Sequence, residues 1–144
     1  MAQWWGPHGF ENVDCRLDPR AGGSYRIVMR SPQGIDYPVQ GLYREVITPK
    51  RLVMTVDCSE HPSEWHDFVR PHRAKDDLNP VGVFVQTVTF QEHEGQTTLT
   101  VTALFDSPEI RDALLDLGMH EGWSQCLERL AALLTRTQSA CSFL

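Results

Sequence analysis

The fold is decided by the stretch SPEIRDALLDLGMHEGWSQCLERLAALLTR, residues 107–136. Its apolar side chains recur mostly at steps of three and four residues, which predicts one apolar face of an α-helix; they are Ile110, Leu114, Leu117, Met119, Trp123, Cys126 or Leu127, Leu130, and Leu133 or Leu134. Ser107 suits an N-cap and Pro108 the first helical position, while Gly118 indicates a kink or a short break. A helix this one-sided needs a large apolar surface, and we expect Leu117, Trp123 and Leu130 to face it.

The chain before this helix has the pattern of a sheet. Alternating apolar and polar residues between glycine- and proline-rich turns predict six strands, at residues 13–17, 24–30, 35–48, 52–58, 81–92 and 97–105. Pro38 and Gly41 indicate an edge position or a bulge in the third strand. Residues 59–80 are polar and without period, which predicts a long loop with room for one short helical turn. Six strands followed by one long helix predict an antiparallel α+β domain.

Length and composition narrow the class of protein. A chain of 144 residues fits one domain, which we place at residues 1–136, with a flexible tail at 137–144. The net charge of −6 argues against nucleic acid as a partner, and no apolar run approaches the length of a membrane span. The four cysteines lie far apart without C-x-x-C spacing, which favours reduced thiols and a cytoplasmic location.

Several short motifs carry a resemblance to a known family. They are Trp4-Trp5-Gly6-Pro7 with Gly9-Phe10, residues 22–30 (GGSYRIVMR), Asp36-Tyr37-Pro38, residues 41–45 (GLYRE), residues 87–90 (TVTF), and Gly118-Met119 with Gly122-Trp123. Across residues 4 to 134 the sequence resembles the bacterial type of the "activator of the heat-shock-protein-ninety ATPase homologue" family, within the START-like (SRPBCC) superfamily. The resemblance implies a helix-grip fold, in which a curved antiparallel sheet wraps a long C-terminal helix around a hydrophobic cavity. Family members usually have a further strand and helix before the Trp4 motif, so we expect an N-terminally shortened form.

Aromatic and sulfur-containing side chains are the candidate ligand-binding residues. Apolar pockets use such side chains because methionine adapts its shape and tryptophan and tyrosine offer a polar tip; the candidates are Trp5, Tyr25, Met29, Tyr37, Met54, Phe84, Met119 and Trp123. We expect them to hold an apolar small molecule between sheet and helix, although ordinary core packing explains each residue singly. Arg26 and Glu121 are candidates for a polar contact to the ligand, with surface pairing as the alternative.

Catalytic and metal-binding patterns are weak in this sequence. It contains no phosphate-binding glycine loop, nucleophile elbow or zincin helix. His61, His66, Asp67 and His72 have residue types that bind metal, but their spacing matches no standard framework, so we expect a polar loop with neither metal nor cofactor. Two alternatives to ligand binding stay open, a co-chaperone that modulates the heat-shock-protein-ninety ATPase and an enzyme, a cyclase or hydrolase, that uses the same cavity.

The final predicted strand suggests how the chain assembles. In the helix-grip family the absent first strand pairs beside this strand, so residues 97–105 would expose unpaired backbone groups. Thr98, Thr100 and Thr102 favour β-structure, and the strand has no lysine or proline to block pairing. We therefore expect a homodimer that joins near this edge, Trp4-Trp5 and the helix.

Overall fold

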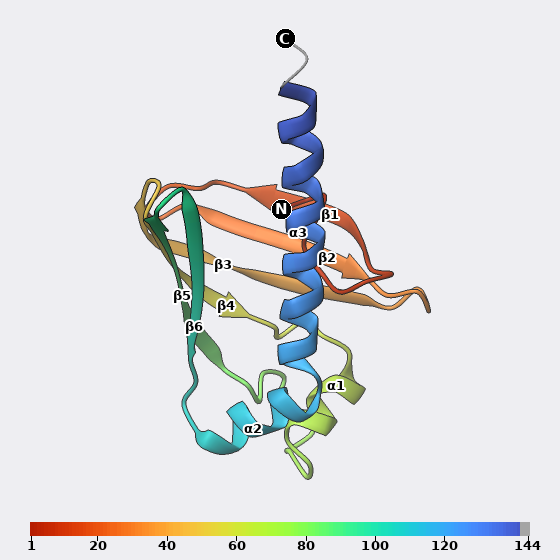
Figure 1. Ribbon diagram of the computed structural model, residues 1–144. Helices are drawn as coiled ribbons and strands as arrows, with labels where there is room; N and C mark the ends of the chain where they lie inside the picture. Colours follow the sequence, from red (N-terminus) through yellow and green to blue (C-terminus); the bar gives the residue numbers. More distant parts are fainter. Residues whose placement is uncertain (142–144) are drawn as a thin grey trace.

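Six antiparallel strands form one curved sheet whose order follows the chain, so β1 and β6 are its two edges (Figure 1). The structure, a computed structural model, describes residues 1–141, with side chains to residue 138. The strands are β1 (Glu11–Leu17), β2 (Ser24–Arg30), β3 (Asp36–Ile47), β4 (Arg51–Asp57), β5 (Val83–His93) and β6 (Gln96–Leu104). The prediction of a curved antiparallel α+β fold with a C-terminal helix is confirmed.

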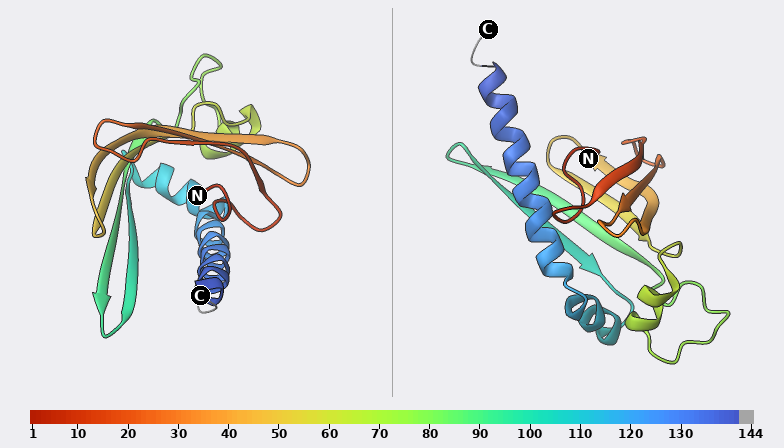
Figure 2. Two further views of the ribbon diagram at one scale, coloured as in Figure 1. Left: turned by 90° about the horizontal axis from the view of Figure 1, so that it is seen from above. Right: turned by 90° about the vertical axis from the view of Figure 1, so that its right-hand side faces the viewer.

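Alternation along the strands sorts side chains onto two faces, as the sequence predicted. On β6, Thr98, Thr100 and Thr102 are exposed, whereas Leu99 and Val101 are partly buried. Buried residues from β2, β3 and β4, together with Cys58 just after β4, form one apolar cluster on the concave face of the sheet, the face toward the C-terminal helix (Figure 2). Its members are Tyr25, Ile27, Val39, Tyr43, Met54, Val56 and Cys58.

Strand β3 corrects one detail of the sequence prediction. It lies inside the sheet, between β2 and β4, and not at an edge. Pro38 is tolerated there because the pairing with β4 begins only at Gln40, so β3 has a single neighbour at the proline. A register shift, which marks a bulge, lies between Tyr43 and Glu45.

The predicted C-terminal helix is two helices separated by the glycine. Helix α2 (Pro108–Asp116) is capped by Ser107, whose hydroxyl accepts a hydrogen bond from the Ile110 amide. Gly118 has φ +87°, a conformation that side chains with a Cβ disfavour, and α3 (Met119–Cys141) follows it. Helix α3 extends five residues beyond the predicted end at Arg136, and the Thr137 hydroxyl donates to the Leu133 carbonyl within it.

The polar stretch after β4 also contains a helix. It is α1 (Ser63–Val69), a seven-residue element. Val69 packs with Val81 and with Ile110 and Leu114 of α2, and this second cluster fixes α2 beneath one end of the sheet. None of the helices in the described part of the chain is long and apolar enough to cross a membrane.

Helix α3 does not lie directly on the sheet, which corrects the expected packing. No Cα atom of α3 comes within 8 Å of a strand Cα atom. The N-terminal segment, residues 1–10, lies between them (Figure 2), and Trp5 packs against both the sheet cluster and Trp123. Leu117 therefore sits at the helix junction with 36% of its surface exposed, and Leu130 is only partly buried.

Candidate functional site

The concave face carries an apolar floor built by strand alternation. Tyr25 and Met54 are both 5% exposed and belong to the sheet cluster. Met29, Phe84 and Trp5 are partly buried and pack against that cluster. Five of the eight predicted ligand-binding residues are thus brought together by one surface, although they come from the N-terminal segment, β2, β4 and β5.

Tyr25 anchors this floor. Its hydroxyl donates to the Thr55 carbonyl oxygen at 2.8 Å, and its ring lies 5.5 Å from that of Tyr43. Burial, reinforced by the nearby Cys58, raises the pKa of Tyr25 well above its usual range. The phenol therefore stays protonated with its proton already donated, which suits a structural contact better than acid–base chemistry.

The N-terminal segment and α3 form a wall beside the floor. The Gly6 amide donates to Cys126 Sγ at 3.1 Å, and Arg129 Nη1 donates to the carbonyls of Gly6 and Pro7 at 2.8 and 2.9 Å. Trp5 reaches from this segment onto the floor, and its indole Nε1 is buried without a hydrogen-bond partner in the described residues. A buried donor with no acceptor is rare in folded proteins.

Gln86 is a polar residue on the floor that the sequence reasoning missed. It is 6% exposed, and its Nε2 donates to Met54 Sδ at 3.9 Å, a weak acceptor. The alternation of β5 could have identified it, because Gln86 occupies an inward position between the apolar Phe84 and Val88. A single amide in an apolar surface is the kind of group that orients a ligand.

The remaining predicted residues border this surface. Tyr37 pairs with Met29 across β2 and β3, and its ring contacts Phe10 and His61 at centroid distances of 5.9 and 5.4 Å. Met119 packs on the second cluster, which Phe84 also contacts, and Trp123 meets Trp5.

The two candidates for a polar ligand contact are paired elsewhere. Arg26 lies on the outer face, where it donates to Glu60 at 2.7 and 2.8 Å and to Gln40 at 2.8 Å. Glu121 is exposed on α3 and accepts from Gln125. Surface pairing, the alternative that the sequence left open, describes both side chains.

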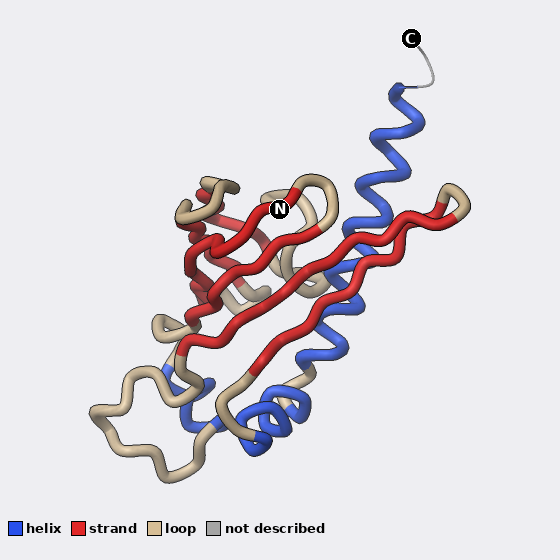
Figure 3. The backbone as a smooth tube through the Cα atoms, turned by 90° about the vertical axis from the view of Figure 1, so that its left-hand side faces the viewer, coloured by secondary structure: helices blue, strands red, loops and turns tan. Residues whose placement is uncertain are grey.

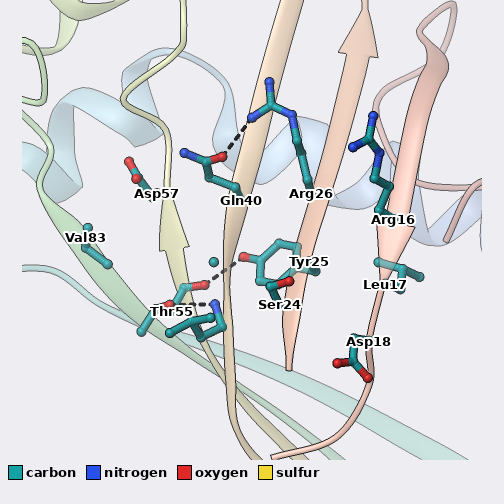
Figure 4. Close-up of a pocket in the computed structure, with 12 residues that line it drawn as sticks. Arg16, Leu17, Asp18, Ser24, Tyr25, Arg26, Gln40, Thr55, Asp57 and Val83 are labelled. Carbon is teal, nitrogen blue, oxygen red and sulfur yellow. Dashed lines mark hydrogen bonds between the residues drawn. The ribbon is translucent and has the colours of Figure 1, made fainter. Parts of the chain in front are cut away.

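A groove lies on the outer face of the sheet (Figure 4). It is an open groove of about 600 Å³ across β1 to β5, and Arg16, Arg26 and Gln40 line one end of it. Gly41 is required beside it, because a Cβ there would overlap the Thr55 carbonyl oxygen. Of the eight predicted ligand-binding residues, only Tyr25 reaches this groove, so it is distinct from the concave floor.

The histidines of the long loop are buried to different extents. His61 lies between Tyr37 and Trp65, and both of its ring nitrogens are buried with no hydrogen-bond partner among the described residues. Burial together with the nearby His66 lowers the pKa of His61 to about 4. His66 is 3% exposed, and its Nε2 lies 3.3 Å from the Ser59 carbonyl. His72 is exposed at a position with φ +66°. Among the side chains that the structure describes, residues 1–138, no group of three metal-ligating side chains converges.

The comparison with protein families agrees with this architecture. The family profile "Activator of Hsp90 ATPase homolog 1-like protein" (AHSA1) matches residues 1–135. The chain belongs to the AHSA1 family. Among the curated proteins, none matches it.

Solved structures of bacterial AHSA1-like proteins share the fold. A protein from Nitrosomonas europaea is 28% identical, with a TM-score of 0.74 over 96% of this chain and 80% of that one. A protein from Mycobacterium smegmatis is 29% identical, with a TM-score of 0.69 over 94% and 76% of the two chains. The AHSA1 protein of Silicibacter pomeroyi, 23% identical with a TM-score of 0.67 over 94% and 81%, supports the fold alone.

Proposed function

We propose that this AHSA1-family chain binds an apolar small molecule that carries a hydrogen-bond acceptor, on the concave face between β2–β5 and α3. The observation that carries the proposal is the unpartnered Trp5 Nε1 beside the apolar floor. An unpaired buried donor costs about 1–3 kcal/mol, and a ligand carbonyl or hydroxyl would recover part of that cost.

The chemistry of the lining supports the same class of ligand. Met29 and Met54 are flexible thioethers that adapt to ligand shape, while Tyr25 and Phe84 supply flat apolar surface. Gln86 provides a second polar group on this floor. No charged side chain belongs to the sheet cluster within the described residues, so a neutral ligand is favoured over an ionised one.

The proposal is tested with Nile red, a neutral apolar probe that has a carbonyl acceptor. We expect saturable binding with a blue-shifted emission, and about three- to tenfold weaker binding by Trp5→Phe, since one hydrogen bond is lost. Trp4→Phe is the matched control, because it removes an indole N–H at the neighbouring position, and it should bind as the parent does. Absence of saturable binding, or equal weakening in the two variants, would contradict the proposal.

The natural ligand is sought by native mass spectrometry of the protein purified from its own host. A bound apolar molecule of defined mass supports ligand binding and identifies the compound. A purified chain that carries no extra mass and also fails to bind Nile red would refute it.

A co-chaperone is the second candidate, because the family description names activation of the Hsp90 ATPase. Its test is the ATPase rate of the chaperone from the same host, measured with and without the chain. Stimulation that survives Trp5→Phe would place this activity outside the concave face. The enzyme alternative gains no support from Tyr25, whose proton is held in a buried hydrogen bond.

A further inference from the structure

Strand β6 ends the sheet with an unpaired edge (Figure 3). Its nine residues, QTTLTVTAL from Gln96 to Leu104, include no charged residue and no proline. Natural sheets usually protect an edge with such residues, because exposed N–H and C=O groups recruit a further strand. The side chains of Thr98, Thr100 and Thr102 are exposed, and Leu104 is 72% exposed.

The space beside this edge is not taken by the helices. No Cα atom of α2 or α3 lies within 8 Å of a β6 Cα atom. A pairing strand lies about 4.7–4.9 Å from its neighbour. Neither helix therefore packs against β6, and no described strand pairs with its outer edge.

We propose that a second copy of this chain binds at this edge. The two β6 strands pair antiparallel about a two-fold axis that passes between the two Thr100 residues. In this register Thr100 faces its own copy and Thr98 faces Thr102 on the outer side of the sheet. Leu99 faces Val101 on the concave side. Directly opposed residues in an antiparallel ladder alternate between hydrogen-bonded and non-hydrogen-bonded pairs, and a two-fold axis can pass through either kind of pair. The proposed register therefore holds for either orientation of the Thr100 backbone groups.

The sequence of β6 favours its own copy because it is self-complementary. Threonine pairs and aliphatic pairs directly across an antiparallel ladder each contribute about 0.2–1 kcal/mol. Charged residues lie only beyond the ends of the strand, at Glu94 and Asp106, so two chains of net charge −6 meet through an uncharged segment. Two-fold pairing is also the commonest symmetry of homo-oligomers, and it joins the two concave floors side by side.

Sedimentation equilibrium at micromolar concentration tests the assembly directly. We expect a species of twice the 16.4 kDa chain mass. Thr100→Lys places two ammonium groups opposite each other at the axis and should return the protein to monomer. Thr89→Lys is the matched control, because Thr89 pairs with Thr100 on the same outer face but lies one strand further from the partner, so this variant should stay dimeric.

Oxidative cross-linking tests the register independently of stability. Thr100→Cys should form a covalent dimer across the axis, whereas Thr89→Cys should not. A monomeric parent chain overturns the proposal. So does a dimer that Thr100→Lys leaves intact and that Thr100→Cys does not cross-link, because its interface would then lie elsewhere. Circular dichroism of each variant confirms that the fold is kept.

Discussion

The indole rings of Trp5 and Trp123 meet edge to face, with their centroids 5.2 Å apart. This contact joins the N-terminal segment to α3, and Trp5 continues from it onto the sheet cluster. Helix α3 is therefore held to the sheet through the N-terminal segment, and the contribution of these contacts to the free energy of unfolding can be measured.

The coupling between the two indoles is the first prediction. Trp5→Ala should lower the free energy of unfolding by about 2–3 kcal/mol, less than the loss for a fully buried tryptophan because Trp5 is partly exposed. A double-mutant cycle with Trp123→Ala, measured by urea unfolding, should give a coupling of about 0.5–1.5 kcal/mol. Strict additivity of the two changes would show that the ring contact contributes nothing of its own.

Arg129 provides a second attachment. Its Nη1 donates to the carbonyls of Trp5, Gly6 and Pro7 at 3.3, 2.8 and 2.9 Å. Arg129→Met keeps much of the aliphatic stem but leaves these acceptors unpaired, so we expect a loss of about 1–3 kcal/mol in urea unfolding. Arg136→Met removes an exposed arginine from the same helix and should be nearly neutral. Equal losses in the two variants would refute the attachment.

His61 should make stability depend on pH. Burial lowers the pKa of its imidazole from 6.5 to about 4, so the folded state resists protonation that the unfolded chain accepts. The contribution of neutral His61 to the free energy of unfolding is fully present above pH 6.5. It falls as the pH drops toward 4, by up to about 3 kcal/mol. Thermal melts across this window should show the decrease.

His61→Phe keeps an aromatic ring between Tyr37 and Trp65 but cannot take up a proton. Its melting temperature should fall less than that of the parent between pH 6.5 and 4. His72→Asn changes an exposed histidine and should keep the parent's full decrease. Parallel pH profiles for the parent and His61→Phe would assign the decrease to other groups.

The thiols should differ in reactivity. Burial raises the pKa of Cys58 to about 12, with Asp57 adding to the effect, and burial also raises the pKa of Cys126. Because the thiolate is the nucleophile, both should react slowly with iodoacetamide in the folded protein, whereas the partly exposed Cys15 should react faster. Peptide mass mapping over time measures the three rates, and rapid labelling of Cys58 would contradict its burial.

Local patterns predicted the elements well. Alternation and turn residues identified all six strands, even though β1 and β6 contain no fully buried residue, and Ser107 and Gly118 marked where the helices begin and break. Helix α1 was less visible, since seven residues are too few to show a helical period. Pro38 wrongly indicated an edge strand, because a proline needs an unpaired side only at its own position and not along the whole strand.

The packing partner of α3 could not be read from the sequence. Amphipathicity shows that a helix buries one face but not what it buries that face against, and here Trp5 and the residues around it intervene. The burial of His61 was hidden for a related reason. Its neighbours in sequence are polar, and the ring is enclosed by Tyr37 from a distant strand and by Trp65 from α1.

The hydrogen bond from the Gly6 amide to Cys126 Sγ spans 120 positions of the chain. During synthesis the ribosome delivers Cys126 long after Gly6, whereas each hairpin of the sheet becomes available as soon as its second strand emerges. Contacts that close so long a loop form late, because their entropy cost is met only once local structure holds the ends near each other. The nascent chain thus passes through an interval in which the sheet and the N-terminal segment have emerged but α3 is not yet in place to hold that segment on the concave face, and a chaperone that shields apolar surface would act in that interval.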